Sequence, residues 1–155
     1  MTETLASGRA RVRCREIMTT DVKTVGRETP ISDVGALMRD ADIGSLPVLE
    51  SGKLVGIVTD RDIVVRAVAQ GHETNTSVGD VMTTEIFSVA PDDFVFEAVR
   101  LMGDKQVRRI PVVNEDRSLA GIIAMADVAL EMEDEREIAE TLEEISSGSA
   151  FWSRK

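Results

Sequence analysis

A hydroxyl, a guanidinium and a carboxylate lie within four consecutive residues, at Thr59, Arg61 and Asp62. They follow the apolar run 54–58, so we predict that they lie where a buried strand gives way to a helix. The hydroxyl and the free N–H groups of a helix start can bind a phosphate, and the guanidinium adds a fixed positive charge. The carboxylate has two acceptor oxygens, which can take both hydroxyls of a ribose. Gly56, without a side chain, would let such a ligand approach the backbone.

The same residues also fit a capping box, in which Thr59 and Asp62 satisfy the N–H groups of the helix start. A capping box needs no ligand. The two roles are compatible, because Asp62 could be released from the cap to a ribose. Taken alone, these residues favour the cap.

Much of the stretch 56–62 recurs 65 residues later in 121–127. The glycine, the two β-branched residues after it and the final aspartate are kept, and the threonine is replaced by Ala124. Two further segments, 18–20 and 46–48, recur at an offset of 64 as Met82-Thr83-Thr84 and Ile110-Pro111-Val112. The extra residue falls in polar connections. We predict that these are hairpin turns, where insertions are best tolerated; they span 50–53 and 114–118.

Each repeat predicts the element order β-α-β-β-α. A helix opens near Pro30 or Pro91, because proline suits the first helical turn. Two short apolar strands follow, and a second helix begins near Asp60 or Met125. The opening strand is predicted to end at Val25 in the first repeat and at Val89 in the second. The later strands are predicted at 46–49 and 54–58 in the first repeat, and at 110–113 and 119–123 in the second. One repeat of ~60 residues is marginal alone, so the two are expected to fold together.

The tandem order, the Met-Thr-Thr openings, Leu46-Pro47-Val48 and the Gly-Ile-Val-Thr-x-x-Asp motif closely resemble the paired CBS (cystathionine-β-synthase) domain, or Bateman module. The resemblance covers about residues 14–130, with repeat 1 at 14–72 and repeat 2 at 78–130. It implies an α/β (α+β) fold in which two β-α-β-β-α repeats pack about a pseudo-twofold axis. It also implies two clefts that bind adenosine compounds such as AMP, ADP, ATP or S-adenosylmethionine.

The resemblance assigns residues to each cleft, which borrows the opening strand of the other repeat to contact the adenine edge. The first cleft would use Thr59, Arg61, Asp62, Leu46 and Pro47, completed by Ile86 and Phe87. The second would use Asp127, completed by Val22 and Lys23.

Some of these assignments have alternatives. Arg108 and Arg109 could replace the hydroxyl missing at Ala124 as phosphate ligands, or could simply be solvated. Phe87 could stack on adenine or belong to the core. We expect the first site to be complete and the second to be weakened or altered in ligand preference.

Composition excludes several classes of function. The formal net charge of −10 argues against nucleic acid as a partner. The longest apolar run, Ala120–Ala126, has seven residues, far fewer than the ~20 that a membrane span needs. Cys14 is the only cysteine and His72 the only histidine, so neither a disulfide nor a cysteine-based metal site is expected within the chain. With no signal-peptide pattern at its start, the chain is expected in the cytoplasm.

Residues 131–146 predict an acidic C-terminal helix, since 131–145 hold eight acids against Arg136. Its apolar stripe must be covered by the body of the protein or by another subunit; it consists of Met132, Ile138, Leu142 and Ile145. Residues 147–155 are predicted to form a flexible tail. Phe151-Trp152 within it is either frayed or a docking tag.

We therefore expect a stand-alone regulatory or sensor protein, not an enzyme, because no cluster of catalytic side chains surrounds the motif. It would bind an adenosine nucleotide, with or without Mg²⁺, have no obligatory cofactor, and signal through conformation or assembly. Family members usually pair into flat dimers through their helices, so a homodimer acting on a separate protein target is expected. The alternatives are a ligand-free interaction scaffold, or S-adenosylmethionine or a reduced dinucleotide as ligand.

Overall fold

The structure, a computed structural model, describes residues 12–131 together with 143 and 145. The chain divides into two compact units, each of which we describe by itself. Unit 1 consists of Met1–Val22, Phe87–Glu115 and Leu119–Lys155, and unit 2 of Lys23–Ile86 and Asp116–Ser118. Each unit thus combines the body of one repeat with the opening segment of the other. This division differs from the repeat boundaries 14–72 and 78–130, which follow the order of the sequence.

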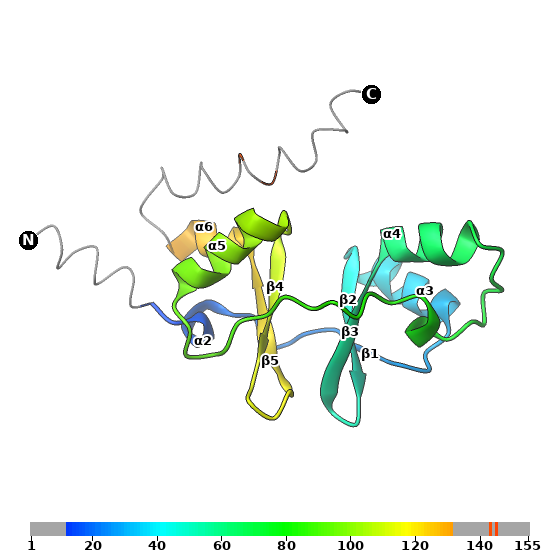
Figure 1. Ribbon diagram of the computed structural model, residues 1–155, viewed down its shortest axis with the longest axis horizontal. Coiled ribbons are helices and arrows are strands. Elements are labelled where there is room, and N and C mark those ends of the chain that lie inside the picture. The colour runs from blue at the N-terminus through cyan, green and yellow to red at the C-terminus, as the bar shows by residue number, and fades with distance from the viewer. Residues whose placement is uncertain (1–11, 132–142, 144, 146–155) are drawn as a thin grey trace, which may run out of the picture. The chain divides into compact units, whose positions relative to one another are not determined.

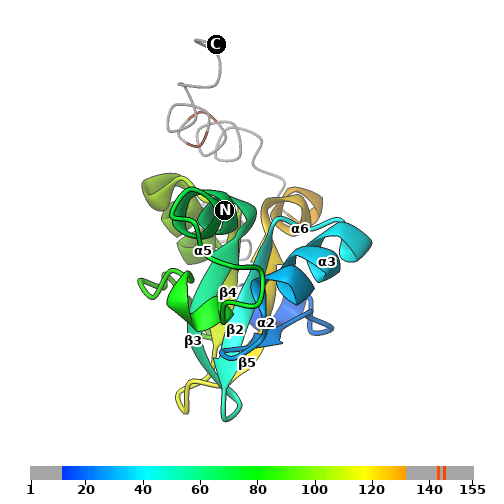
Figure 2. The same ribbon diagram turned by 90° about the vertical axis from the view of Figure 1, so that its right-hand side faces the viewer.

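Unit 2 contains a three-stranded sheet in the order β1-β2-β3. The strands are β1 (Val25–Gly26), β2 (Ser45–Glu50) and β3 (Lys53–Thr59). β2 and β3 pair antiparallel, which confirms the predicted hairpin, and β1 runs parallel to β2. The helices lie against one face of this sheet (Figure 1), and Figure 2 shows them in front of β2 and β3.

The helices of unit 2 begin close to the predicted positions. α3 (Ile31–Ala41) has Pro30 as its N-cap, and α4 (Asp60–Asp62) has Thr59. α4 continues as a π-helix, η1 (Ile63–Val68), in place of the predicted α-helix. Three β-branched residues in succession, Ile63-Val64-Val65, lower the α-helical propensity here. A short 3₁₀ turn, η2 (Val78–Asp80), precedes residues 81–86, which open repeat 2 but belong to unit 2. We call the opening segment of a repeat that lies in the unit of the other repeat its exchanged segment.

Unit 1 repeats this plan with the hairpin β4 (Arg109–Val113) and β5 (Leu119–Ala124), followed by α6 (Met125–Glu131). Val89 forms a parallel bridge to Val112, at the position where the first repeat has β1. Unit 1 also contains α2 (Cys14–Ile17), which the sequence did not predict, and α5 (Val95–Lys105). The α/β fold with two β-α-β-β-α units is therefore confirmed.

The prediction that α5 opens at Pro91 was wrong by about one turn. The backbone carbonyls of Pro91 and Asp93 accept hydrogen bonds from the N–H groups of Arg15 and Cys14. The Asp93 carboxylate accepts the N–H of Ala90 at 2.8 Å, which closes a turn ahead of the helix. These contacts with Cys14 and Arg15, in the exchanged segment of repeat 1, hold residues 91–93 out of the helix.

Each unit has its own apolar core. The core of unit 2 centres on Leu46, Val48 and Val58, and that of unit 1 on Ile110, Ile123 and Met102. Ile145 is helical and only 4% exposed, and it packs into the core of unit 1. This residue of the predicted stripe is therefore covered by the protein's own body. The rest of the acidic helix, apart from Glu131 and Glu143, and the whole tail 147–155 lie outside the described residues.

No helix in the described part of the chain is long and apolar enough to cross a membrane.

Candidate functional site

The junction between β3 and α4 forms the capping box that the sequence predicted. The Thr59 hydroxyl accepts the N–H of Asp62 at 3.0 Å, and the Asp62 carboxylate accepts the N–H of Thr59 at 3.0 Å. Asp62 is 8% exposed, which makes it a rare buried carboxylate. The cap is local in origin, because both partners lie within one helical turn.

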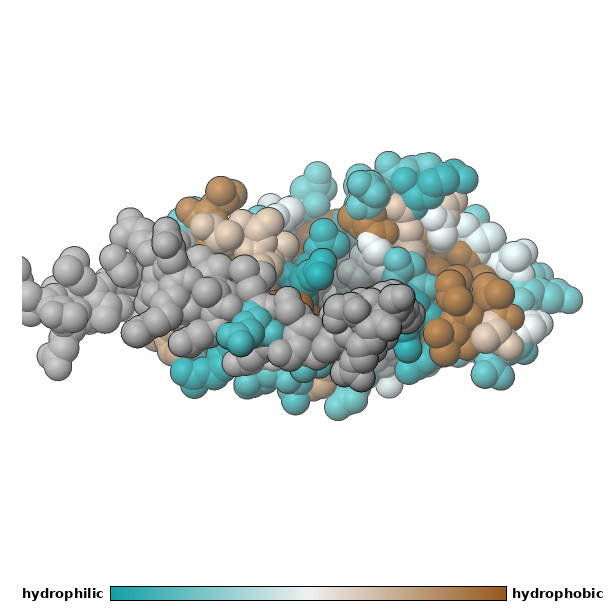
Figure 3. Space-filling model, turned by 90° about the horizontal axis from the view of Figure 1, so that it is seen from above, coloured by the Kyte–Doolittle hydropathy of each residue, from teal (hydrophilic) through white to brown (hydrophobic). Residues whose placement is uncertain are grey.

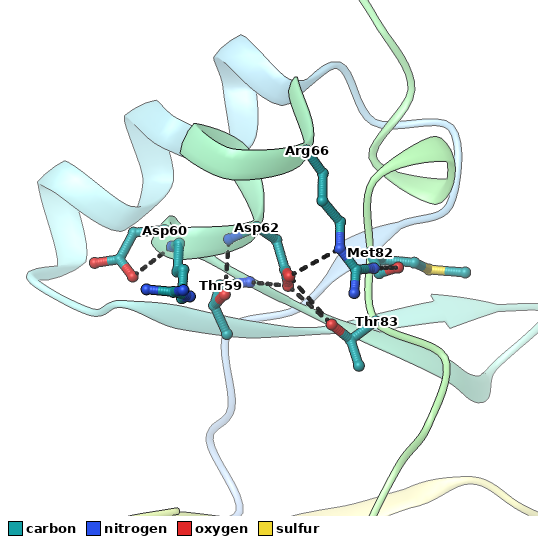
Figure 4. A network of polar contacts seen from close by, with 7 residues as sticks. Thr59, Asp60, Asp62, Arg66, Met82 and Thr83 are labelled. Carbon is teal, nitrogen blue, oxygen red and sulfur yellow. Dashed lines mark hydrogen bonds and ion pairs between the residues drawn. The ribbon is translucent and has the colours of Figure 1, made fainter. Parts of the chain in front are cut away.

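Two more residues bind the same carboxylate (Figure 4). The Thr83 hydroxyl donates to both oxygens of Asp62 at 3.2 Å. The guanidinium of Arg66 reaches from η1, with its Nε 3.7 Å from Oδ1 of Asp62. A second guanidinium nitrogen of Arg66 donates to the carbonyl of Met82 at 3.1 Å. The buried negative charge is therefore held by an N–H, a hydroxyl and a cation, as a buried charge requires.

The sequence had not singled out Thr83 or Arg66 as site residues. Thr83 belongs to the Met-Thr-Thr opening of repeat 2, which indicated the internal repeat in the sequence but no site. Arg66 follows Asp62 by four residues, and oppositely charged residues at this spacing meet on one helix face. That spacing was a signal that could have identified Arg66.

Gly56 provides space for the exchanged segment. A Cβ built on Gly56 would lie 2.5 Å from Sδ of Met82 and 3.0 Å from the carbonyl oxygen of Thr83. Ile57 and Thr83 exchange two backbone hydrogen bonds beside it, at 2.9 and 2.8 Å. The prediction that Gly56 leaves room for a ligand at the backbone was therefore wrong, since the segment Met82-Thr83 lies there.

The second junction, between β5 and α6, keeps half of the capping box. The Asp127 carboxylate accepts the N–H of Ala124 at 3.0 Å, but Ala124 has no hydroxyl to return a bond. Gly121 again allows a close approach, here with its Cβ position 2.6 Å from the carbonyl oxygen of Thr19. Ile122 and Thr19 exchange backbone hydrogen bonds at 3.0 and 2.9 Å. The two junctions are thus built alike, each with the opening segment of the other repeat.

The other residues predicted for the first site are placed in different ways. Leu46 and Pro47 are buried in β2, opposite Val58 and Ile57, and Leu46 belongs to the core of unit 2. Arg61 is exposed, and its N–H donates to the Asp60 carboxylate at 2.8 Å. The structure therefore groups only Thr59 and Asp62 directly.

The predicted adenine-contacting pairs straddle the division between the units. Ile86 is in unit 2 and Phe87 in unit 1, where the Lys105 ammonium lies 4.6 Å from the centre of its ring. Similarly, Val22 is in unit 1 and Lys23 in unit 2.

Arg108 and Arg109 are both exposed at the start of β4. The carbonyl of Arg108 accepts the N–H of Met125, at the beginning of α6, at 2.8 Å. This bond brings the backbone of the arginine segment to the junction that carries Asp127.

Cys14 is fully buried in unit 1, where its thiol donates to the carbonyl of Phe94 at 3.7 Å. Burial, reinforced by the nearby Asp93 and Glu97, raises the pKa of the Cys14 thiol to about 12. A thiol that stays protonated at neutral pH is a poor nucleophile and a poor metal ligand. Within the described residues, no group of three or more histidine, cysteine or acidic side chains could hold a metal ion.

The two junctions, each paired with the opening segment of the other repeat, define a tandem pair of α/β repeats. The model of the CBS domain matches the chain twice, over residues 14–68 and 78–134. The chain belongs to the CBS-domain family. Among its relatives, the CBS domain-containing protein YhcV of Bacillus subtilis is 38% identical over 132 residues, which cover 85% of this chain and 94% of that protein.

Three of the solved structures that are similar to this chain illustrate the likeness. Hypoxic Response Protein I with two coordinated zinc ions has a TM-score of 0.72 and 35% identity, covering 78% of this chain and 99% of that one. CBSX2 in complex with AMP has a TM-score of 0.69 and 26% identity, covering 77% and 94%. The CBS domain pair of protein MJ0100, in complex with methylthioadenosine and S-adenosylmethionine, has a TM-score of 0.66 and 25% identity, covering 77% and 94%.

Proposed function

We propose that the chain is a regulatory module that binds an adenosine compound of the AMP, ADP or ATP class and has no catalytic activity of its own. The observation that carries this proposal is the repeated strand-to-helix junction. In both copies, a carboxylate is fixed by a backbone N–H of the junction, through Asp62 in one and Asp127 in the other. A carboxylate fixed in this way can accept both hydroxyls of a ribose.

The similar structures support adenosine as the common part of the ligand. CBSX2 was solved with AMP, and MJ0100 with methylthioadenosine and S-adenosylmethionine. The compounds named share adenosine and differ in what the ribose carries. The exposed guanidinium groups of Arg61, Arg108 and Arg109 favour a phosphate, with or without Mg²⁺.

A thermal-shift panel tests this proposal. Adenosine compounds at 100 times their dissociation constant are expected to raise the melting temperature by about 5 °C or more, since such occupancy adds about 2.7 kcal/mol. The panel includes AMP, ADP, ATP, S-adenosylmethionine and a reduced dinucleotide, with GMP and GTP as matched controls. If no adenosine compound at millimolar concentration moves the melting temperature, the chain is the ligand-free scaffold instead.

We also propose that the chain forms a homodimer through its helices. Val64, Val65 and Val68 of η1 are 57%, 46% and 67% exposed, an unusual density of large apolar side chains on one short helix. Figure 3 shows apolar surface where this helix is exposed. Leu130 occupies the position in α6 that Val65 occupies in η1, 65 residues earlier, and it is 85% exposed. An apolar position exposed in both repeats supports a contact with a second copy.

Replacing Val65 with aspartate is expected to convert the dimer to a monomer, because the new carboxylate of each copy would be buried in the dimer interface without a partner of opposite charge. Light scattering after size exclusion measures the mass. Gln70→Asp, which adds the same charge at an exposed position just after η1, is the control and should leave the dimer intact. A wild-type protein that is monomeric, or a Val65→Asp variant that remains dimeric, would contradict this interface.

A further inference from the structure

The carboxylates of Asp62 and Asp127 differ in the hydrogen-bond and ion-pair partners that they have within the described residues. Asp62 accepts hydrogen bonds from the N–H of Thr59 and the hydroxyl of Thr83, and it pairs with Arg66. In the described part of the chain, the bond that Asp127 accepts comes from the N–H of Ala124. A ribose approaching Asp62 would meet oxygens that already accept hydrogen bonds. Among the described residues, only one oxygen of Asp127 accepts a hydrogen bond.

The difference arises from the residues that surround each carboxylate. The repeat offset of 65 places Glu131 where the first repeat has Arg66, so the second carboxylate lacks that cation. Thr19 is the counterpart of Thr83, but it is exposed, and within the described residues no hydrogen bond joins its hydroxyl to Asp127. The second junction therefore has neither of the two groups that close the first.

We propose that Thr83 and Arg66 act as a latch on Asp62, which a ribose must displace before it can bind there. The latch consists of the hydroxyl bonds from Thr83 to Asp62 and the contacts of Arg66 with Asp62 and Met82. This inference rests on the proposed function. It reverses the expected order of the sites, because an adenosine compound fills the Asp127 site first and the Asp62 site only when the latch opens.

The latch also gives the Asp62 site a way to signal. The segment Met82-Thr83 is attached to unit 2 by its backbone pair with Ile57, by the Thr83 hydroxyl and by Arg66. When a ribose diol takes Asp62, the Thr83 hydroxyl loses its acceptor and Arg66 loses its ion-pair partner. The segment then has fewer attachments, and the chain passes into unit 1 at Phe87, four residues after Thr83. Occupancy of the Asp62 site is thereby coupled to the chain segment that joins the two units.

Calorimetric titration with AMP tests the latch in an Asp127→Ala background, where the remaining binding reports the Asp62 site. Adding Thr83→Val removes the hydroxyl while keeping the shape of the side chain. We expect it to tighten AMP binding about five-fold or more, because the ribose no longer competes with a hydrogen bond to a charged group. Thr84→Val is the matched control, an exposed neighbour that should leave the affinity unchanged.

Thr83→Ser, which keeps the hydroxyl, should bind AMP as weakly as the Asp127→Ala parent and thereby show that the hydroxyl is responsible. Weaker or unchanged AMP binding with Thr83→Val would overturn the latch, since a purely structural or ligand-binding threonine cannot tighten binding when removed. That result would leave the proposed function in place. AMP binding that is absent from the wild-type protein as well would instead overturn the proposed function, and the latch with it.

Discussion

Replacing Asp62 with alanine is expected to lower the free energy of unfolding by about 2–4 kcal/mol. The substitution removes the Asp62 half of the capping box and leaves the partly buried N–H of Thr59 without its acceptor, while the N–H at position 62 still bonds the Thr59 hydroxyl. It also leaves the hydroxyl of Thr83 without its acceptor, because this hydroxyl donates to both oxygens of the same carboxylate. The loss of several partners at one buried position makes this larger than the effect of a typical surface substitution.

Urea denaturation followed by circular dichroism measures this loss, with the slope checked for constancy between variants. Asp127→Ala is the matched control, since it removes the equivalent carboxylate from a junction where one N–H is bonded to it. It should cost about 1 kcal/mol, the usual value for one hydrogen bond. Equal losses from the two substitutions would show that Thr83 and Arg66 contribute nothing to holding Asp62.

The local parts of the site could be predicted from the sequence. The capping box of Thr59 and Asp62 depends on residues three apart, and such short-range patterns are visible without knowledge of the fold. The hairpins followed from the one-residue change in the repeat offset, which had to fall in a turn. The α/β architecture followed from the repetition of one pattern in two halves of the chain.

The tertiary parts could not be predicted in the same way. Thr83 contacts Asp62 across 21 residues, because the opening segment of repeat 2 pairs with β3 of the first repeat. The same exchange explains Gly56, whose missing side chain accommodates Met82 and leaves no gap for a ligand. It also explains the late start of α5, where the opening segment of repeat 1 occupies the backbone groups of residues 91 and 93.

The expected relative affinity of the two sites depends on these tertiary contacts. From the sequence, the loss of a hydroxyl at Ala124 suggested that the second site is the weaker one. In the structure, the Thr59 hydroxyl is bonded to the N–H of Asp62, so it belongs to the cap before any phosphate arrives. The junction with the complete capping box, at Asp62, is therefore also the one whose carboxylate is held by Thr83 and Arg66.

Removing the ribose hydroxyls from the ligand is expected to weaken binding to the wild-type protein about ten-fold or more. The matched pair of ligands is AMP and 2′,3′-dideoxyadenosine monophosphate, which share the base and the phosphate. The physical reason is the fixed carboxylate at each junction, above all at Asp127, whose second oxygen would accept the hydroxyls of AMP. Asp127→Ala should remove the tighter phase of AMP binding for the same reason.

Calorimetric titration of the wild-type protein with this pair of ligands tests most directly whether the junction carboxylates recognise ribose. We expect AMP to bind at least about ten-fold more tightly than its dideoxy analogue, and the tighter phase to disappear in Asp127→Ala. Equal affinity of the wild-type protein for the two ligands would contradict it, because a carboxylate that receives no hydroxyl plays no part in recognising the nucleotide.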